Sequence, residues 1–160
     1  MPAIGIRAAT SEIFYVIVDG SPDNPEIIIK DKLRKPKAFD LPDSLSWYRE
    51  NLMGIFKEYS ISACGIKVAE PFSRAKATTI PQGTIIRAHV EGVIMEAAKN
   101  FGLLVVIAPL ATISSLIDTK SAKKYFKSDE FRGLSGWGNM NQQYKEATLA
   151  GIAALRGRNG

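Results

Sequence analysis

The chain begins with two short apolar runs joined by a three-residue polar turn. Residues 3–8 form the first run, residues 12–18 form the second, and residues 9–11 lie between them. β-Branched and aromatic residues dominate the second run, which is typical of strands. The pattern predicts an antiparallel hairpin that starts a mixed sheet. Arg7 falls at the end of the first strand, where such sheets collect functional side chains.

Strands and helices alternate along the rest of the chain. We expect strands at 26–30, 61–69 and 103–107, helices at 44–59, 83–101, 110–117, 121–126 and 141–156, and a polar connection at 73–82. Apolar residues that recur every three or four positions indicate the longer helices. The order β-β-β-α-β-α-β-α-α predicts an α/β fold, a five-stranded mixed sheet with helices on both faces.

Composition and charge limit the classes of protein to which the chain can belong. With 160 residues, 46% of them hydrophobic, the chain suits a single domain, residues 1–160, with one substantial core. No apolar run approaches the ~18 residues of a membrane span, and we see no secretory signal. The lone cysteine, Cys64, cannot form a disulfide within the chain, so we expect a cytoplasmic protein. The net charge of +5 permits contact with nucleic acid without requiring it.

Four segments resemble the motifs of one protein family, in the same order along the chain. They are Ile4-Gly5-Ile6-Arg7, Gly65-Ile66-Lys67 followed by Phe72, residues 87–93 and residues 145–153. With the order of strands and helices, they resemble the RuvC-like branch of the ribonuclease H-like fold, the Holliday-junction resolvase group. The chain is more similar still to an uncharacterised bacterial family of catalytically degenerate members. The resemblance implies a ribonuclease H-like sheet, DNA or RNA as a partner, and a homodimer.

The chain departs from this family at the positions of the catalytic acids. Family nucleases hold two divalent cations with carboxylates, and the cations clamp the attacking and leaving oxygens of a phosphate. The resemblance assigns those positions to Arg7 and Lys67 on strands and to Lys145 and Thr148 on the last helix. Cationic side chains repel Mg²⁺. The resemblance therefore implies a nuclease fold without catalytic residues, bound metal or other cofactor.

Two acidic residues near these positions keep a second hypothesis open. Glu70 lies three residues beyond Lys67, and Glu146 directly follows Lys145. One residue turns a helix by about 100°, so we expect Glu146 to face away from the site. The alternative function is a divergent metal-dependent nuclease that uses Glu70 and Glu146.

The cations that replace the acids allow two interpretations. They could converge into a pocket that binds phosphate without chemistry. They could instead pair one by one with nearby carboxylates, namely Glu70, Glu91 and Glu146. Convergence of like charges is costly unless an acid or an anion neutralises them, which favours the second interpretation.

A glycine-rich loop at residues 132–139 contains a second group of candidates. Arg132 and Trp137 could stack on a base or anchor a partner protein. The alternative is that Trp137 folds back over the edge of the sheet.

The sequence predicts a catalytically inactive RuvC-like protein that acts by binding nucleic acid or a partner protein. Besides the divergent nuclease, one further alternative remains. It is a protein-interaction subunit, part of a larger protein complex, that has no affinity for nucleic acid. Salt-dependent binding to nucleic acid would distinguish the nucleic-acid-binding protein from the protein-interaction subunit, because phosphate contacts weaken steeply as salt rises.

Overall fold

One five-stranded mixed sheet organises the structure, a computed structural model that describes residues 1–70 and 80–159. Its strands are β1 (Ala3–Ala8), β2 (Glu12–Gly20), β3 (Pro25–Arg34), β4 (Ala63–Lys67) and β5 (Leu104–Ala108). The order across the sheet is β3-β2-β1-β4-β5. The first three strands pair antiparallel, whereas β4 runs parallel to both β1 and β5. The predicted α/β sheet with an initial hairpin is confirmed.

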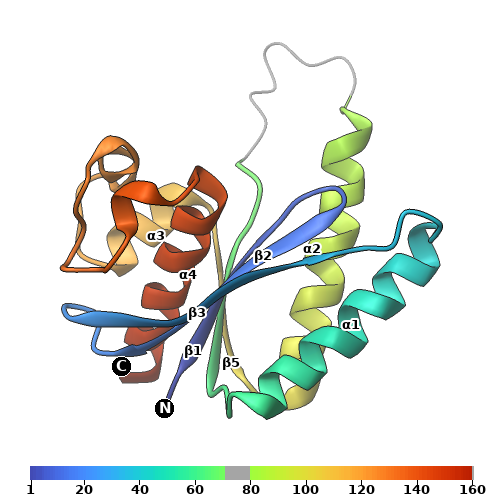
Figure 1. Cartoon of the computed structure of the whole chain (residues 1–160), viewed down its shortest axis with the longest axis horizontal. Coiled ribbons are helices and arrows are strands. Elements are labelled where there is room, and N and C mark those ends of the chain that lie inside the picture. The colour runs from blue at the N-terminus through green and yellow to red at the C-terminus, as the bar shows by residue number, and fades with distance from the viewer. Residues whose placement is uncertain (71–79, 160) are drawn as a thin grey trace.

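Helices cover both faces of this sheet (Figure 1). α1 (Leu41–Glu58) and α2 (Gln82–Phe101) lie on one face, and α3 (Leu110–Leu116) and α4 (Gln142–Asn159) lie on the other. Two short 3₁₀ helices, η1 (Ala122–Lys127) and η2 (Trp137–Asn139), lie in the connection between α3 and α4. Within the described residues, no helix combines the length and the apolar character that a bilayer crossing requires.

The main difference from the predicted elements is the length of β3. The sequence predicts a strand over 26–30, but the ladder continues to Arg34, which pairs with Glu12 of β2. The basic stretch that follows residue 30 therefore belongs in part to the edge of the sheet. Most of the predicted connection at 73–82 and Phe72 of the fourth-strand motif lie outside the described residues.

The alternation of side chains along the central strands places two charged residues under α4. Ile4 and Ile6 of β1 belong to the core cluster formed with α1 and α2. Gly5 contacts α4 instead, and Arg7 shares the face of Gly5 because side chains alternate along a strand. β4 runs parallel to β1, and Gly65 of β4 pairs with Gly5. Lys67, two residues after Gly65, therefore lies on the same face as Arg7.

α4 packs against β1 and β4 so closely that backbone touches backbone. A Cβ atom on Gly5 would lie 1.8 Å from the carbonyl oxygen of Ala147, and one on Gly65 would lie 1.9 Å from that of Ala150. Only glycine fits at either position. This close packing sets the first turn of α4 over the ends of both strands.

Replacing Gly65 with alanine is expected to destabilise the protein, because the added methyl group meets the backbone of α4. Overpacking a core costs about 1–3 kcal/mol, and we expect the upper end of this range because a helix backbone yields less than a side chain. Urea denaturation followed by circular dichroism measures the free energy of unfolding.

Gly92→Ala is the matched control. Nothing lies within 4 Å of a Cβ atom at Gly92. Alanine is favoured over glycine inside a helix by about 0.8–1 kcal/mol, so this variant should be at least as stable as the wild type. A Gly65→Ala protein with wild-type stability would contradict the close packing.

Candidate functional site

Charged side chains from four segments meet where β1 and β4 end under α4. Arg7 comes from β1, Lys67 from β4, Glu70 from the residues just after β4, and Glu146 from the first turns of α4. All four are residues that the sequence singled out. We call these four residues the ion-pair network.

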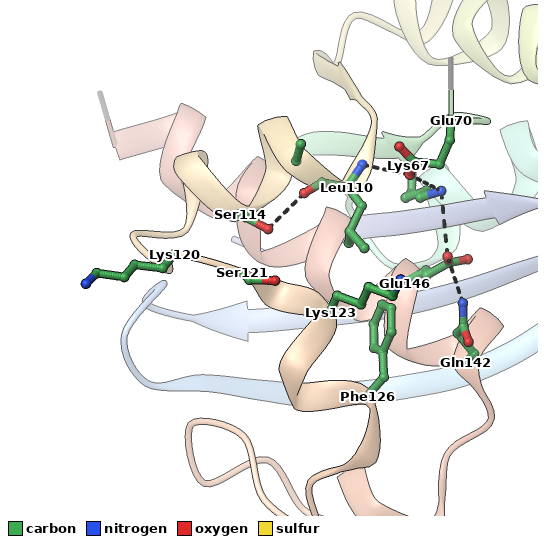
Figure 2. A pocket seen from close by; sticks show the side chains of 11 residues that line it. Lys67, Glu70, Leu110, Ser114, Lys120, Ser121, Lys123, Phe126, Gln142 and Glu146 are labelled. Atoms are coloured by element: carbon green, nitrogen blue, oxygen red, sulfur yellow. Dashed lines mark hydrogen bonds and ion pairs between the residues drawn. The ribbon is translucent and has the colours of Figure 1, made fainter. Parts of the chain in front are cut away.

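The network is held by short contacts around Glu146 and Lys67. The Nε of Arg7 donates to Oε2 of Glu146 at 2.8 Å, and the Nζ of Lys67 lies 3.6 Å from Oε1 of the same carboxylate. The Nζ of Lys67 also lies 2.8 Å from Oε1 of Glu70 (Figure 2). Lys67 is 3% exposed and Glu146 4% exposed, so each charge depends on its partners and not on water.

The expectation that Glu146 faces away from the site is wrong. Ala147, Ala150 and Gly151 are the residues of α4 that approach the strands. Glu146 lies one turn before Ala150 and continues the same side of the helix. Its carboxylate therefore reaches the ends of β1 and β4, and the rotation of α4 brings Glu146 to the site in place of Lys145.

Lys145 and Thr148 do not join the network. The Nζ of Lys145 donates to the backbone oxygen of Phe126 at 2.6 Å and lies 5.4 Å from the centre of the Trp137 ring. Thr148 is fully buried, and its hydroxyl donates to the backbone oxygen of Tyr144 at 2.7 Å. Lys145 joins α4 to η1, whereas the hydroxyl group of Thr148 bonds within α4.

Glu70 links the network to α3. Its Oε1 accepts the N–H of Leu110 at 3.1 Å and also contacts Lys67. Burial by itself raises the pKa of Glu70, but the hydrogen bonds from Lys67 and Leu110 outweigh burial, and the pKa is lowered. Glu70 is therefore ionised at neutral pH and pairs with Lys67 as a full charge.

A second ion pair on α2 supports the network from the opposite face of the sheet. The Nε of Arg87 lies 3.8 Å from Oε2 of Glu91, and this oxygen accepts the N–H of Ala69 at 3.1 Å. Nη2 of Arg87 donates to the backbone oxygen of Lys67 at 3.4 Å. Burial, followed by the like charge of Arg7, lowers the pKa of Arg87.

The sequence reasoning gave Arg87 no role and named Glu91 only as a possible partner. The available signal was their spacing of four residues, which places two side chains together on a helix. Burial raises the pKa of Glu91, while Arg87 acts to lower it. This pair fastens the backbone that leaves β4 to α2.

A pocket of about 480 Å³ opens beside the network, between α3, η1 and α4. Lys67, Glu70 and Glu146 line one side, and Lys120 and Lys123 line the side toward η1. Figure 2 shows Lys120 pointing outward and Lys123 extending across the pocket. Within residues 1–70 and 80–159, neither lysine forms an ion pair, and both are exposed.

The structure decides between the two placements that the sequence leaves open for Trp137. The indole is fully buried, its Nε1 donates to the backbone oxygen of Tyr125 at 2.9 Å, and its ring lies 5.0 Å from that of Phe131. Arg132 donates to the backbone oxygens of Pro22 and Ile117. Trp137 has no exposed face on which a base could stack, and Arg132 fastens the loop to neighbouring segments.

The side chains of the ion-pair network do not fit a two-metal site of the kind that family nucleases hold with carboxylates. Arg7 and Lys67 already contact both carboxylate oxygens of Glu146, and Lys67 also contacts Oε1 of Glu70. In the described part of the chain, no cluster of three or more His, Cys, Asp or Glu side chains could hold a metal ion. A divalent cation at this point would meet an ammonium and a guanidinium group at close range, which repel it.

Comparison with known proteins gives a match by structure and none by sequence. No protein-family model matches the chain, and no curated protein sequence matches it significantly. The structure is similar to that of Thermus thermophilus RuvC in complex with a Holliday junction substrate, with a TM-score of 0.74 and 11% identity over 100% of this chain and 97% of that one. RuvC from the same organism, in a structure described without a substrate, gives a TM-score of 0.73 at 10% identity over 100% of this chain and 97% of that one.

The yeast mitochondrial Holliday junction resolvase Ydc2 is also similar, with a TM-score of 0.64 and 13% identity over 96% of this chain and 77% of that one. Identities this low show the fold alone. The predicted ribonuclease H-like fold, with its five-stranded mixed sheet in the order 3-2-1-4-5, is thereby confirmed and matches the fold of the RuvC structures.

Proposed function

We propose that this protein is a RuvC-like pseudo-nuclease that binds nucleic acid without cleaving it. The main support is the pairing of Arg7 and Lys67 with Glu146 at the ends of β1 and β4. A nuclease of this type needs free carboxylates there to hold the metal ions that activate a phosphate. In this protein, the charge of Glu146 is already neutralised by two side chains of the same chain.

Attraction for phosphate comes from the lysines around the pocket and not from the network. Within the network, Arg7 and Lys67 balance Glu70 and Glu146. η1 and the residue two positions before it carry four exposed lysines, which are Lys120, Lys123, Lys124 and Lys127. The chain as a whole carries a net charge of +5. Such a surface favours the phosphate backbone of DNA or RNA, which is bound chiefly by lysine and arginine.

The proposal also covers the domain organisation, the cellular compartment and the oligomeric state of the protein. The whole chain, residues 1–160, acts as one domain in the cytoplasm, and two copies form a homodimer as the family resemblance implies. One of the similar structures contains a Holliday junction substrate. Branched DNA is therefore the first nucleic acid to test, with duplex DNA, single-stranded DNA and RNA as comparisons.

Replacing Lys120 and Lys123 with alanine is expected to weaken nucleic-acid binding. Each lost phosphate contact lowers the slope of log K against log salt by about 0.9 on duplex DNA, so the slope of the double variant should fall by about 2. Fluorescence anisotropy of labelled four-way, duplex and single-stranded substrates at several salt concentrations measures this slope.

Lys57→Ala/Lys99→Ala is the control, because it removes the same charge from exposed positions on α1 and α2. It should leave the salt slope unchanged. If the wild type binds no DNA or RNA even at low salt, nucleic-acid binding is ruled out. The protein-interaction subunit then becomes the better explanation.

No cleavage is expected in Mg²⁺ or Mn²⁺, because Lys67 and Arg7 compete with any metal for the carboxylate oxygens. Incubating labelled four-way and single-stranded DNA with the protein and separating the products on a denaturing gel tests this. Metal-dependent cleavage that disappears in Glu146→Gln would overturn the proposal. It would establish the divergent nuclease that uses Glu70 and Glu146.

A further inference from the structure

Lys67 joins the two carboxylates of the network through a single ammonium group. Its ammonium group lies 2.8 Å from Glu70 and 3.6 Å from Glu146, two carboxylates that come from different segments. The side chain is 4% exposed, so water solvates the ammonium very little. Figure 2 shows Lys67 between the two carboxylates. A buried ammonium remains charged only where such partners surround it.

Each carboxylate that contacts Lys67 is bound to a further element. Glu70 accepts the N–H of Leu110 at the start of α3. Glu146 accepts from Arg7 of β1 at 2.8 Å. Through one ammonium group, the ends of β1 and β4 are therefore joined to α3 and α4. A single cation shared by carboxylates from separate segments is the arrangement by which bound metal ions tie a fold together.

We propose that the Lys67 ammonium is a built-in cation that takes the place of a bound divalent metal between Glu70 and Glu146. Two consequences follow. The native protein gains no stability from divalent cations, because its cation is covalently attached. Removal of the Lys67 side chain uncovers a cation site, because the carboxyl groups of Glu70 and Glu146 then face the space that the ammonium group occupied. This inference goes beyond the proposed function, since it concerns what holds the site together and not what binds to it.

The donor atoms that would remain are suited to a hard divalent ion. Glu70 and Glu146 supply carboxylate oxygens, and the Nε2 of Gln142, which donates to Oε1 of Glu146 at 3.5 Å, helps to hold that carboxylate in place. Oxygen ligands of this kind suit Mg²⁺ and Mn²⁺. Arg7 stays in place on the far oxygen of Glu146, so we expect one ion of modest affinity and not a pair of ions.

The test compares Lys67→Ala with the wild type in thermal unfolding, with and without Mn²⁺. Without metal, the variant should melt lower by on the order of 10 °C, because the buried Glu146 keeps only Arg7 as a cationic partner and the half-exposed Glu70 loses Lys67. Saturating Mn²⁺ should restore roughly 5–10 °C of this loss, as expected for a ligand that binds only the folded state. The melting temperature of the wild type should not change. Electron paramagnetic resonance of Mn²⁺ counts the bound ions, and we expect one in the variant and none in the wild type.

Two further variants isolate the carboxylate site. Lys123→Ala removes a lysine that lines the same pocket but forms no ion pair with Glu70 or Glu146, so the stability of this variant should not respond to Mn²⁺. Adding Glu146→Gln to Lys67→Ala should abolish the response, because the second carboxylate is lost.

The outcome is decisive even if Lys67→Ala fails to fold without metal. Refolding that depends on Mn²⁺ would support the proposal, and refolding that Mn²⁺ does not restore would overturn it. The wild type provides a test that needs no stable variant. A wild-type protein that binds Mn²⁺ in a manner lost on Glu146→Gln would show that Lys67 does not replace the metal.

Discussion

The contact between the backbone of α4 and the backbones of β1 and β4 determines the geometry of the site. Gly5 and Gly65 have no side chains, so the helix rests almost directly on the two central strands. At this separation, the first turns of α4 lie over the carboxyl ends of the strands. A larger residue at either glycine would move the helix outward, and Glu146 would no longer reach Arg7 and Lys67.

The same close packing explains why Arg7, Lys67 and Glu146 are largely buried although they are charged. Arg7 and Lys67 lie on the face of the sheet that α4 covers, so their charges are removed from most of the surrounding water. Burying a charge is unfavourable unless opposite charges and hydrogen bonds compensate it. The carboxylates of Glu146 and Glu70 provide this compensation. Each charged side chain of the network therefore needs its partners in place. This need fixes the ends of β1, β4 and α4 relative to one another, and it matters more than any net gain in stability from the ion pairs.

This charge balance has a direct meaning for chemistry at the site. A carboxylate that accepts from Arg7 and contacts Lys67 has little capacity left for a metal ion. The fold matches that of the RuvC structures, while both oxygens of Glu146 contact cationic side chains of the same chain. The exposed lysines near the pocket lie outside this balance and keep their attraction for anions.

The sequence by itself determined the hairpin, the order of the elements, and the presence of Arg7 and Lys67 at strand ends. Runs of β-branched and aromatic residues, and apolar residues that recur every three or four positions, carry that information locally. The choice between Lys145 and Glu146 was decided only by the tertiary structure. α4 is rich in small residues, so its sequence pattern does not fix which side faces the sheet, and contacts with Gly5 and Gly65 set its rotation. The burial of Trp137 and the position of Arg87 likewise depend on partners distant in sequence, which no local pattern encodes.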